Sequence, residues 1–92
     1  MTQLAGRILA LLEVRHLTQM VAEICERRGV SALDLCGRDR SLSICHARQE
    51  LWWQLRNDPG REYSYSEIAR LFDRDHATIL HGIAAHTRRS CR

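Results

Sequence analysis

The residues from 74 to 78 form a dense run of hydrogen-bonding groups directly before an apolar stripe: Arg74-Asp75-His76-Ala77-Thr78. An arginine fork pairs with the edge of guanine, and a carboxylate accepts a hydrogen bond from the amino group of cytosine or adenine. The methyl groups of Ala77 and Thr78 suit contact with the thymine methyl group. The run therefore indicates a surface that reads base edges in duplex DNA, although a histidine that stands alone is ordinarily a capping or surface residue.

Two helices are predicted to position this run. Ser64 and Glu67 have the S-x-x-E spacing of a capping box, and the apolar residues that follow have helical spacing: Ile68, Ala69, Leu71 and Phe72. Polar residues 73–75 interrupt the period, and a second stripe then runs to about Arg89: Ile79, Leu80, Ile83 and Thr87. This is the pattern of a helix-turn-helix, whose second helix presents its N-terminal residues to bases. The pattern alone does not distinguish it from any other helical hairpin.

The rest of the chain also has helical periodicity. Apolar stripes lie within residues 4–12 and 17–25, Ser31 is placed to cap a short turn through Leu35, and a long helix is predicted over 42–56. The Asn-Asp-Pro-Gly cluster at 57–60 ends that helix. No stretch alternates cleanly between polar and apolar residues, so the sequence predicts an all-α fold. We expect one domain over residues 1–92, a bundle of four to five helices with an N-terminal helix in residues 1–15 and a helix-turn-helix over about residues 64–89.

The composition is that of a folded globular protein. Of the 92 residues, 45% are hydrophobic and 27% are charged, and the net charge is +3. This excess does not by itself indicate nucleic acid, but all fourteen basic residues are arginine, which suits bidentate contact with phosphate and guanine. No apolar run approaches the roughly 18 residues that a membrane span requires, and no signal peptide is recognisable. We therefore expect a cytoplasmic protein with no membrane partner.

The four cysteines show no metal-binding pattern. Cys25, Cys36, Cys45 and Cys91 include no CxxC pair, and in a cytoplasmic protein they are expected to be reduced thiols. A zinc site of Cys36, Cys45 and His46 is conceivable, but small buried apolar residues are the better interpretation of Cys25 and Cys45. We expect no metal and no cofactor. No Ser/His/Asp or Cys/His group has the flanking glycines of a nucleophile turn, so we also expect no enzymatic activity.

The helix-turn-helix region resembles the C-terminal, origin-binding domain of the bacterial replication initiator DnaA. The signature of that family reads roughly S-x-x-x-I-G-x-x-F and then R-D-H-[ST]-T-V-x-H, and residues 64–72 and 74–81 follow it closely. Upstream segments also match the family: Val21-Ala22-Glu23, Leu33-Asp34-Leu35, the loop Arg38-Asp39-Arg40-Ser41, and Ala47-Arg48-Gln49. The resemblance covers about residues 17–86, and it implies a Trp-repressor-like helical domain that binds double-stranded DNA.

The resemblance implies a role for each matching residue. The residues that would enter the major groove are Arg74, Asp75, His76 and Thr78, with Ala77 on the same surface. Arg40 would reach the adjacent minor groove, where narrow A·T-rich steps attract arginine. The residues that would hold phosphates and set the register are Arg48, Gln49, Arg56, Ser64 and Ser66. On the residues alone, Arg48 either contacts phosphate or lies along its apolar helix face and pairs with an acid such as Asp75.

The chain also departs from the family. Ala77 stands where the family has Ser or Thr, Asp39 lies inside the basic loop, and Asp73 replaces a glycine-rich turn. These changes alter the reading surface and are expected to lower non-specific affinity. The sequence has no GxxxxGK[ST] phosphate loop and no lysine with which to build one, so the ATPase module is missing and no nucleotide is expected to bind.

Two functions follow. The leading interpretation is sequence-specific binding of double-stranded DNA at initiator-box-like sites, in replication initiation, its regulation or transcription regulation, without ATPase activity. The alternative interpretation has the same helical fold but no strong binding to DNA. In that case the chain is a helical protein-interaction module that binds a replication or regulatory partner, or a second copy of itself, through residues 1–15 or Trp53.

Overall fold

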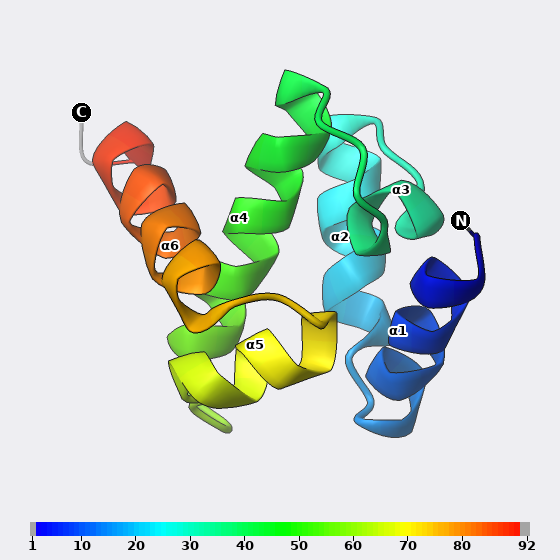
Figure 1. The fold of residues 1–92 in the computed structure, drawn as a ribbon, viewed down its shortest axis with the longest axis horizontal. Helices are drawn as coiled ribbons and strands as arrows, with labels where there is room; N and C mark the ends of the chain where they lie inside the picture. Colours follow the sequence, from blue (N-terminus) through cyan, green and yellow to red (C-terminus); the bar gives the residue numbers. More distant parts are fainter. Residues whose placement is uncertain (1, 91–92) are drawn as a thin grey trace. The chain divides into compact units, whose positions relative to one another are not determined.

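The structure, a computed structural model, describes residues 2–90, and within that range it is all-α with no strand (Figure 1). The helices are α1 (Thr2–Val14), α2 (Thr18–Arg28), α3 (Ala32–Cys36), α4 (Leu42–Arg56), α5 (Tyr65–Phe72) and α6 (His76–Ser90). The prediction of an all-α chain is confirmed. The described part has six helices where four to five were expected, because the short turn capped by Ser31 is itself helical.

The chain divides into two compact units, unit 1 (residues 1–48) and unit 2 (residues 49–92). The boundary lies inside α4, so its first residues belong to unit 1 and the remainder to unit 2. A boundary inside a helix leaves no Pro-, Gly- or Ser-rich linker in the sequence, and the sequence analysis therefore had no signal for it. The prediction of a single domain stays a prediction.

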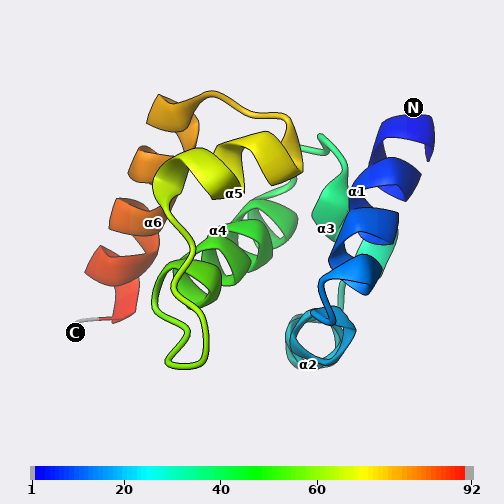
Figure 2. The same cartoon turned by 90° about the horizontal axis from the view of Figure 1, so that it is seen from below.

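Unit 1 packs α3 beside α1 and α2 (Figure 2). Its buried apolar residues come from all four of its helical segments and the turn before α2: Ala5, Ile8, Leu12, Leu17, Val21, Ile24, Leu35, Cys36, Ile44 and Ala47. Leu11, which shares the predicted stripe of α1, is instead 45% exposed. Gly29 ends α2 with a left-handed conformation (φ 68°), and its N–H donates to the carbonyl of Cys25 at 2.8 Å.

Unit 2 packs α5 against α6, with the second part of α4 contributing to the same core. Its buried apolar residues are Leu51, Trp52, Leu55, Tyr63, Ile68, Ala69, Leu71, Phe72, Ile79 and Ile83. The Trp52 and Phe72 rings meet edge to face with their centroids 6.0 Å apart. A Cβ on Gly82 would lie 2.7 Å from two carbons of the Trp52 ring, so α6 lies against that ring only because residue 82 has no side chain.

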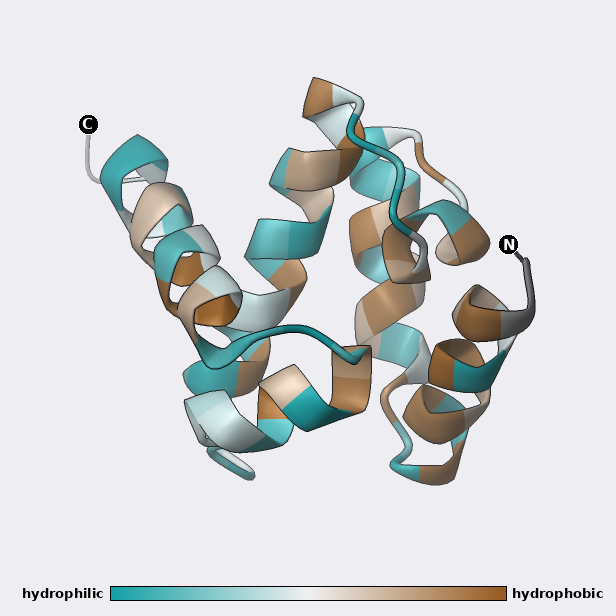
Figure 3. Ribbon diagram, viewed as in Figure 1, coloured by the Kyte–Doolittle hydropathy of each residue, from teal (hydrophilic) through white to brown (hydrophobic). Residues whose placement is uncertain are grey.

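Two of the segments that connect the helices are more hydrophilic than the helices that form these cores. Figure 3 shows the turn between α5 and α6, and the loop before α4, as hydrophilic stretches between helices that carry apolar residues. These two segments hold the charged residues that the sequence analysis singled out, at 38–41 and 73–75. The fold therefore supplies two packed units, and each of them contains one of these two charged segments.

The cysteines correct one expectation. Cys36 is buried, whereas Cys25 and Cys45, which were both expected to be buried apolar residues, are only half-buried. Burial raises the pKa of the Cys36 thiol to about 11, which keeps it protonated. Cys91 lies outside the described residues. In residues 2–90, no His, Cys, Asp and Glu side chains gather in a group of three or more that would hold a metal ion.

Candidate nucleic-acid interface

The turn between α5 and α6 has the geometry of a helix-turn-helix. Asp73 adopts a left-handed conformation (φ 54°, ψ 51°) that ends α5, and the Arg74 N–H returns to the carbonyl of Ala69 at 2.9 Å. The carbonyl of Asp75 accepts from the Ile79 N–H at 3.2 Å, which begins α6 at His76. Asp75, His76 and Ala77 are exposed, and Arg74 and Thr78 are half-buried. Three of the five predicted reading residues are therefore exposed at this helix start.

Aromatic contacts connect this helix start with the end of α4. The Tyr65 and His76 rings meet edge to face with centroids 5.8 Å apart, and the Arg56 guanidinium lies 4.9 Å from the centre of the Tyr65 ring. Arg56 also forms an ion pair with Glu62 at 2.8 Å. A hydrogen bond to Tyr65, with the help of Glu62, raises the pKa of Arg56. Tyr65 therefore lies between a predicted phosphate contact and a predicted base contact.

Tyr65 is a residue that the sequence analysis missed. The signal that would have found it is its place as the first residue after the Ser64 cap, eleven positions before His76. Its ring is half-buried, so it combines packing with a polar contact. We expect it to orient its two neighbours rather than to read bases.

Arg74 and Gln49 pack against Trp52 and α6 respectively, within unit 2. The Arg74 guanidinium lies 5.9 Å from the centre of the buried Trp52 ring, at the outer limit for a cation–π contact. The side chain of Gln49 is half-buried, its Cγ lies 3.2 Å from where a Gly82 Cβ would be, and its buried Oε1 has no hydrogen-bond partner in the described part of the chain. Both side chains are therefore supported by the core of unit 2.

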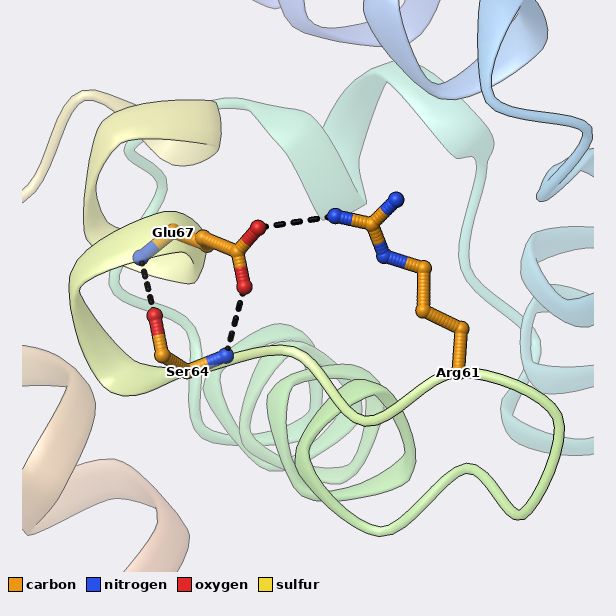
Figure 4. A network of polar contacts seen from close by, with 3 residues as sticks. All are labelled: Arg61, Ser64 and Glu67. Atoms are coloured by element: carbon orange, nitrogen blue, oxygen red, sulfur yellow. Dashed lines mark hydrogen bonds and ion pairs between the residues drawn. The ribbon is translucent and has the colours of Figure 1, made fainter.

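The start of α5 is closed by a capping box, as predicted. Ser64 Oγ accepts from the Glu67 N–H at 3.1 Å, Ser64 N–H donates to Glu67 Oε1 at 2.9 Å, and Arg61 Nη2 donates to Glu67 Oε2 at 2.8 Å (Figure 4). The hydrogen bond from the Ser64 main chain is the main cause of the lowered pKa of Glu67. A phosphate at Ser64 would share this helix start with the Glu67 carboxylate, whereas Ser66 is exposed one residue inside α5.

In unit 1, the loop before α4 exposes Arg40 between two bonded neighbours. Asp39 Oδ1 accepts from both the N–H and the hydroxyl of Ser41 at 2.7 Å, and these bonds lower the pKa of Asp39. The carbonyl of Ser41 in turn accepts from the Cys45 N–H at 2.9 Å, in the first turn of α4. Asp39, which was considered only as a charge that weakens the loop, therefore fixes the start of α4.

Arg48 lies differently from the phosphate contact that the resemblance implied. The residue is only 4% exposed, and its guanidinium donates to the main-chain carbonyls of Leu35 (3.1 Å), Asp34 (3.1 Å) and Asp39 (3.2 Å). Arg48 lies on the apolar face of α4 with the buried residues Ala47 and Leu51, so its side chain points into the interior of the protein. A guanidinium with its donors used in this way is not presented to a phosphate.

The family model described as "Bacterial dnaA protein helix-turn-helix" matches residues 17–85 of the 92. The chain belongs to the bacterial DnaA helix-turn-helix family. The match agrees with the resemblance over about residues 17–86, and it supports DNA binding in replication initiation. No curated protein and no solved structure gave a significant match.

The departures from the DnaA pattern can now be placed in the structure. Asp73 occupies the left-handed position in the turn, which a glycine adopts without strain. Ala77 is exposed on the first turn of α6, so the missing hydroxyl alters the reading surface and not the core. Both changes lie in the helix-turn-helix segment, within the residues that the family model matches.

Two further expectations concern partners. Trp53, the suggested partner surface, is half-buried and packs on the buried His86 with ring centroids 5.4 Å apart. In the N-terminal helix, Leu11 and Val14 are 45% and 75% exposed. Between residues 2 and 90, the chain has no helix with the length and apolar character that crossing a bilayer would take.

Proposed function

We propose that this DnaA-family chain binds double-stranded DNA in a sequence-specific way at initiator-box-like sites. The observation that carries the proposal is the start of α6, where Asp75, His76 and Ala77 are exposed on a helix-turn-helix of this family. These groups stand at the N-terminal end of a helix, which is the part that enters the major groove in such folds. Bound to such sites, the protein acts in replication initiation, in its regulation, or as a transcription regulator in the nucleoid.

The proposed contacts are divided between bases and backbone. Base reading in the major groove involves Arg74, Asp75, His76, Ala77 and Thr78, and Arg40 reaches the minor groove from the loop of unit 1. The residues proposed to hold phosphates are Gln49, Arg56, Ser64 and Ser66. Arg56 can exchange its exposed partner Glu62 for a phosphate at little cost, because a surface ion pair contributes little to stability. Arg48 is not included, because its donors are used inside unit 1.

Without a phosphate loop in these 92 residues, the proposed activity involves no ATP hydrolysis. This segment, bound to an initiator box, would not itself drive nucleotide-dependent assembly. It would instead compete for the boxes or regulate a promoter that contains one.

The test is a titration of the protein with a duplex that carries an initiator box and with a scrambled duplex, at two salt concentrations. We expect the box to bind more tightly, by about 1–3 kcal/mol for each base pair that the scramble changes at a read position. Both duplexes should lose affinity with salt, with a slope of about 0.9 per phosphate contact. Equal, weak binding of both duplexes at both salt concentrations would contradict the proposal.

A pair of histidines on α6 provides matched variants. His76→Ala should weaken binding to the box duplex by about 1–3 kcal/mol and leave the scrambled duplex nearly unchanged, because it removes a base contact. His81→Ala removes an exposed histidine five residues further along the same helix and should bind like the parent. Equal effects of the two substitutions would remove His76 from the reading surface.

The exposed apolar residues of α1 favour a second candidate, a module that binds a replication or regulatory protein. Leu11 and Val14 lie on a helix outside the family match, whereas Trp53 is already packed on His86. The combined variant Arg40→Ala, His76→Ala separates the two functions. A pure interaction module should keep its cellular effect in this variant, and a DNA-binding protein should lose it.

A further inference from the structure

Arg48 joins three segments of unit 1 through one buried guanidinium. Nε donates to the carbonyl of Leu35, and Nη2 donates to the carbonyls of Asp34 and Asp39. Asp34 and Leu35 belong to the last turn of α3, where the Asp34 carbonyl also accepts from the N–H of the Gly37 cap at 3.2 Å. Arg48 therefore caps the C-terminus of α3 with a cation, which is also the favourable charge at that end.

The third bond reaches across the loop to Asp39. The main chain of Asp39 is held from inside by Arg48, and its carboxylate is held by Ser41 on the other side of Arg40. Arg40 itself is exposed. The loop thus has a fixed residue on each side of the arginine that is proposed to enter the minor groove.

A helix as short as α3 needs such support. It has only five residues, and a helix of that length is not stable without tertiary contacts. Burial lowers the pKa of Arg48, but an arginine remains charged in proteins, so the carbonyl dipoles around it and the nearby Asp39 carboxylate offset its charge. Leaving the buried cation without these bonds would be costly, which keeps the guanidinium in place.

We propose that Arg48 is a positioning residue, whose buried guanidinium holds the loop of residues 37–41 in one conformation and so sets the point from which Arg40 reaches DNA. The inference rests on the proposed function for its DNA consequence, but the ordering of the loop stands without DNA. Only arginine offers a planar fork with several donors at fixed angles, whereas lysine is a point charge on a flexible stem.

The first experiment uses trypsin, because Arg38 and Arg40 are themselves exposed cleavage sites within the loop. The parent, Arg48→Lys and Arg48→Met are digested briefly, and the cut positions are assigned by mass spectrometry. We expect cleavage after Arg38 and Arg40 to become about tenfold faster in Arg48→Lys, the factor that corresponds to one lost charged hydrogen bond, and faster still in Arg48→Met, which loses all three bonds. Arg7→Met, which removes an exposed arginine of α1, should leave the loop as resistant as in the parent.

The digestion also separates local loosening from unfolding. Cleavage after Arg15 and Arg27, which are exposed elsewhere in unit 1, is measured in the same samples. If cleavage there accelerates as much as in the loop, Arg48 supports unit 1 as a whole and the proposal is overturned. Unchanged cleavage after Arg38 and Arg40 in both variants overturns it as well.

The second experiment is a double-mutant cycle of Arg40→Ala and Arg48→Lys on the box duplex. If Arg48 acts through the loop, Arg48→Lys should weaken binding when Arg40 is present and have almost no further effect when Arg40 is absent. If the two substitutions instead reduce the affinity independently, so that their factors multiply in the double variant, Arg48 is an independent phosphate contact and the inference is overturned. If the parent does not distinguish the box from a scrambled duplex, the proposed function fails, and the trypsin result still decides whether Arg48 orders the loop.

Discussion

The two segments proposed to meet DNA are held by different physical means. The loop before α4 is fixed by polar bonds from two side chains, Arg48 and Asp39. The turn before α6 is fixed mainly by apolar packing, with Phe72 on one side of it and Ile79 on the other, both buried. A segment held by a few polar bonds should loosen locally when one is lost. A segment that is part of a core should change only when the core itself is disturbed.

The largest expected effect tests the packed region. Gly82→Ala would place a Cβ 2.7 Å from two Trp52 ring carbons, and we expect it to lower the free energy of unfolding by about 1–3 kcal/mol. Gly6→Ala is the matched control in unit 1, because it lies in α1 with no atom within 4 Å of the new Cβ. It should raise the free energy of unfolding by about 0.5–1 kcal/mol. Urea unfolding of the two variants measures both changes in the free energy of unfolding. If Gly82→Ala is as stable as the parent, α6 does not lie so close to Trp52.

The next effect concerns the start of α6. Tyr65→Ala removes the ring that contacts both His76 and Arg56, and it should weaken binding to the box duplex by about 0.5–1.5 kcal/mol. Tyr65→Phe keeps the ring contacts and loses the hydrogen bond to Arg56, so its affinity should fall between those of the parent and Tyr65→Ala. Titrations at a temperature where circular dichroism shows both variants folded provide the measurement. Parent-like binding by Tyr65→Ala would mean that His76 is oriented by its own helix alone.

Left-handed residues at the ends of α2 and α5 give a further comparison. Gly29 and Asp73 have similar backbone angles, but only the first is glycine. Gly29→Ala should cost about 1 kcal/mol of stability, because a Cβ is strained at this φ. Asp73→Gly should instead stabilise the protein by less than about 1 kcal/mol, since Asp tolerates this conformation better than most residues. Thermal unfolding of both variants measures these opposite changes in stability. If Asp73→Gly is destabilised, the contacts of the aspartate side chain stabilise the protein by more than its left-handed backbone destabilises it.

The smallest effect is a dependence of stability on pH. Glu67 and Asp39 both have lowered pKa values in the folded protein, chiefly because each carboxylate accepts a main-chain N–H, from Ser64 and Ser41 respectively. Their contribution is therefore fully present above the unfolded pKa values of about 4.3 and 3.9, and it is lost as the pH falls through the lower folded values.

We expect Glu67→Gln and Asp39→Asn each to flatten the fall in thermal midpoint as the pH is lowered below about 4.5, the region set by those unfolded values. Glu26→Gln, which removes an exposed carboxylate of α2, serves as the control and should follow the parent. If only one of the two variants flattens the curve, the hydrogen bond to the carboxylate stabilises the protein in that unit alone.

The helix-turn-helix was largely predictable because its signals are local. The capping box depends on residues three positions apart, and the break at 73–75 depends on polar residues that interrupt an apolar period. The boundaries of α5 and α6 followed from these within a residue or so. The break between α4 and α5, which spans residues 57–64, was also predicted at 57–60, since Pro59 and Gly60 disfavour helical continuation.

Residues with distant partners were less predictable. Sequence spacing placed Arg48 on an apolar face but did not reveal whether that face covered three carbonyls from residues 34, 35 and 39 or lay open to phosphate. The same limit applies to Tyr65, whose partners lie nine residues before it and eleven after it. Leu11 and Cys25 share apolar stripes with buried residues, yet a stripe does not say which of its members lie at the edge of the buried face.

The sequence by itself determined the helical class, the capped starts of α3 and α5, and the identity of the run at 74–78, because each depends on neighbouring residues along one helix. Tertiary structure alone decided that Arg48 turns inward and that Gly82 lies against Trp52. The physical reason is that the position of a buried side chain depends on the atoms that pack around it and on the carbonyls within its reach, and these belong to other segments of the chain.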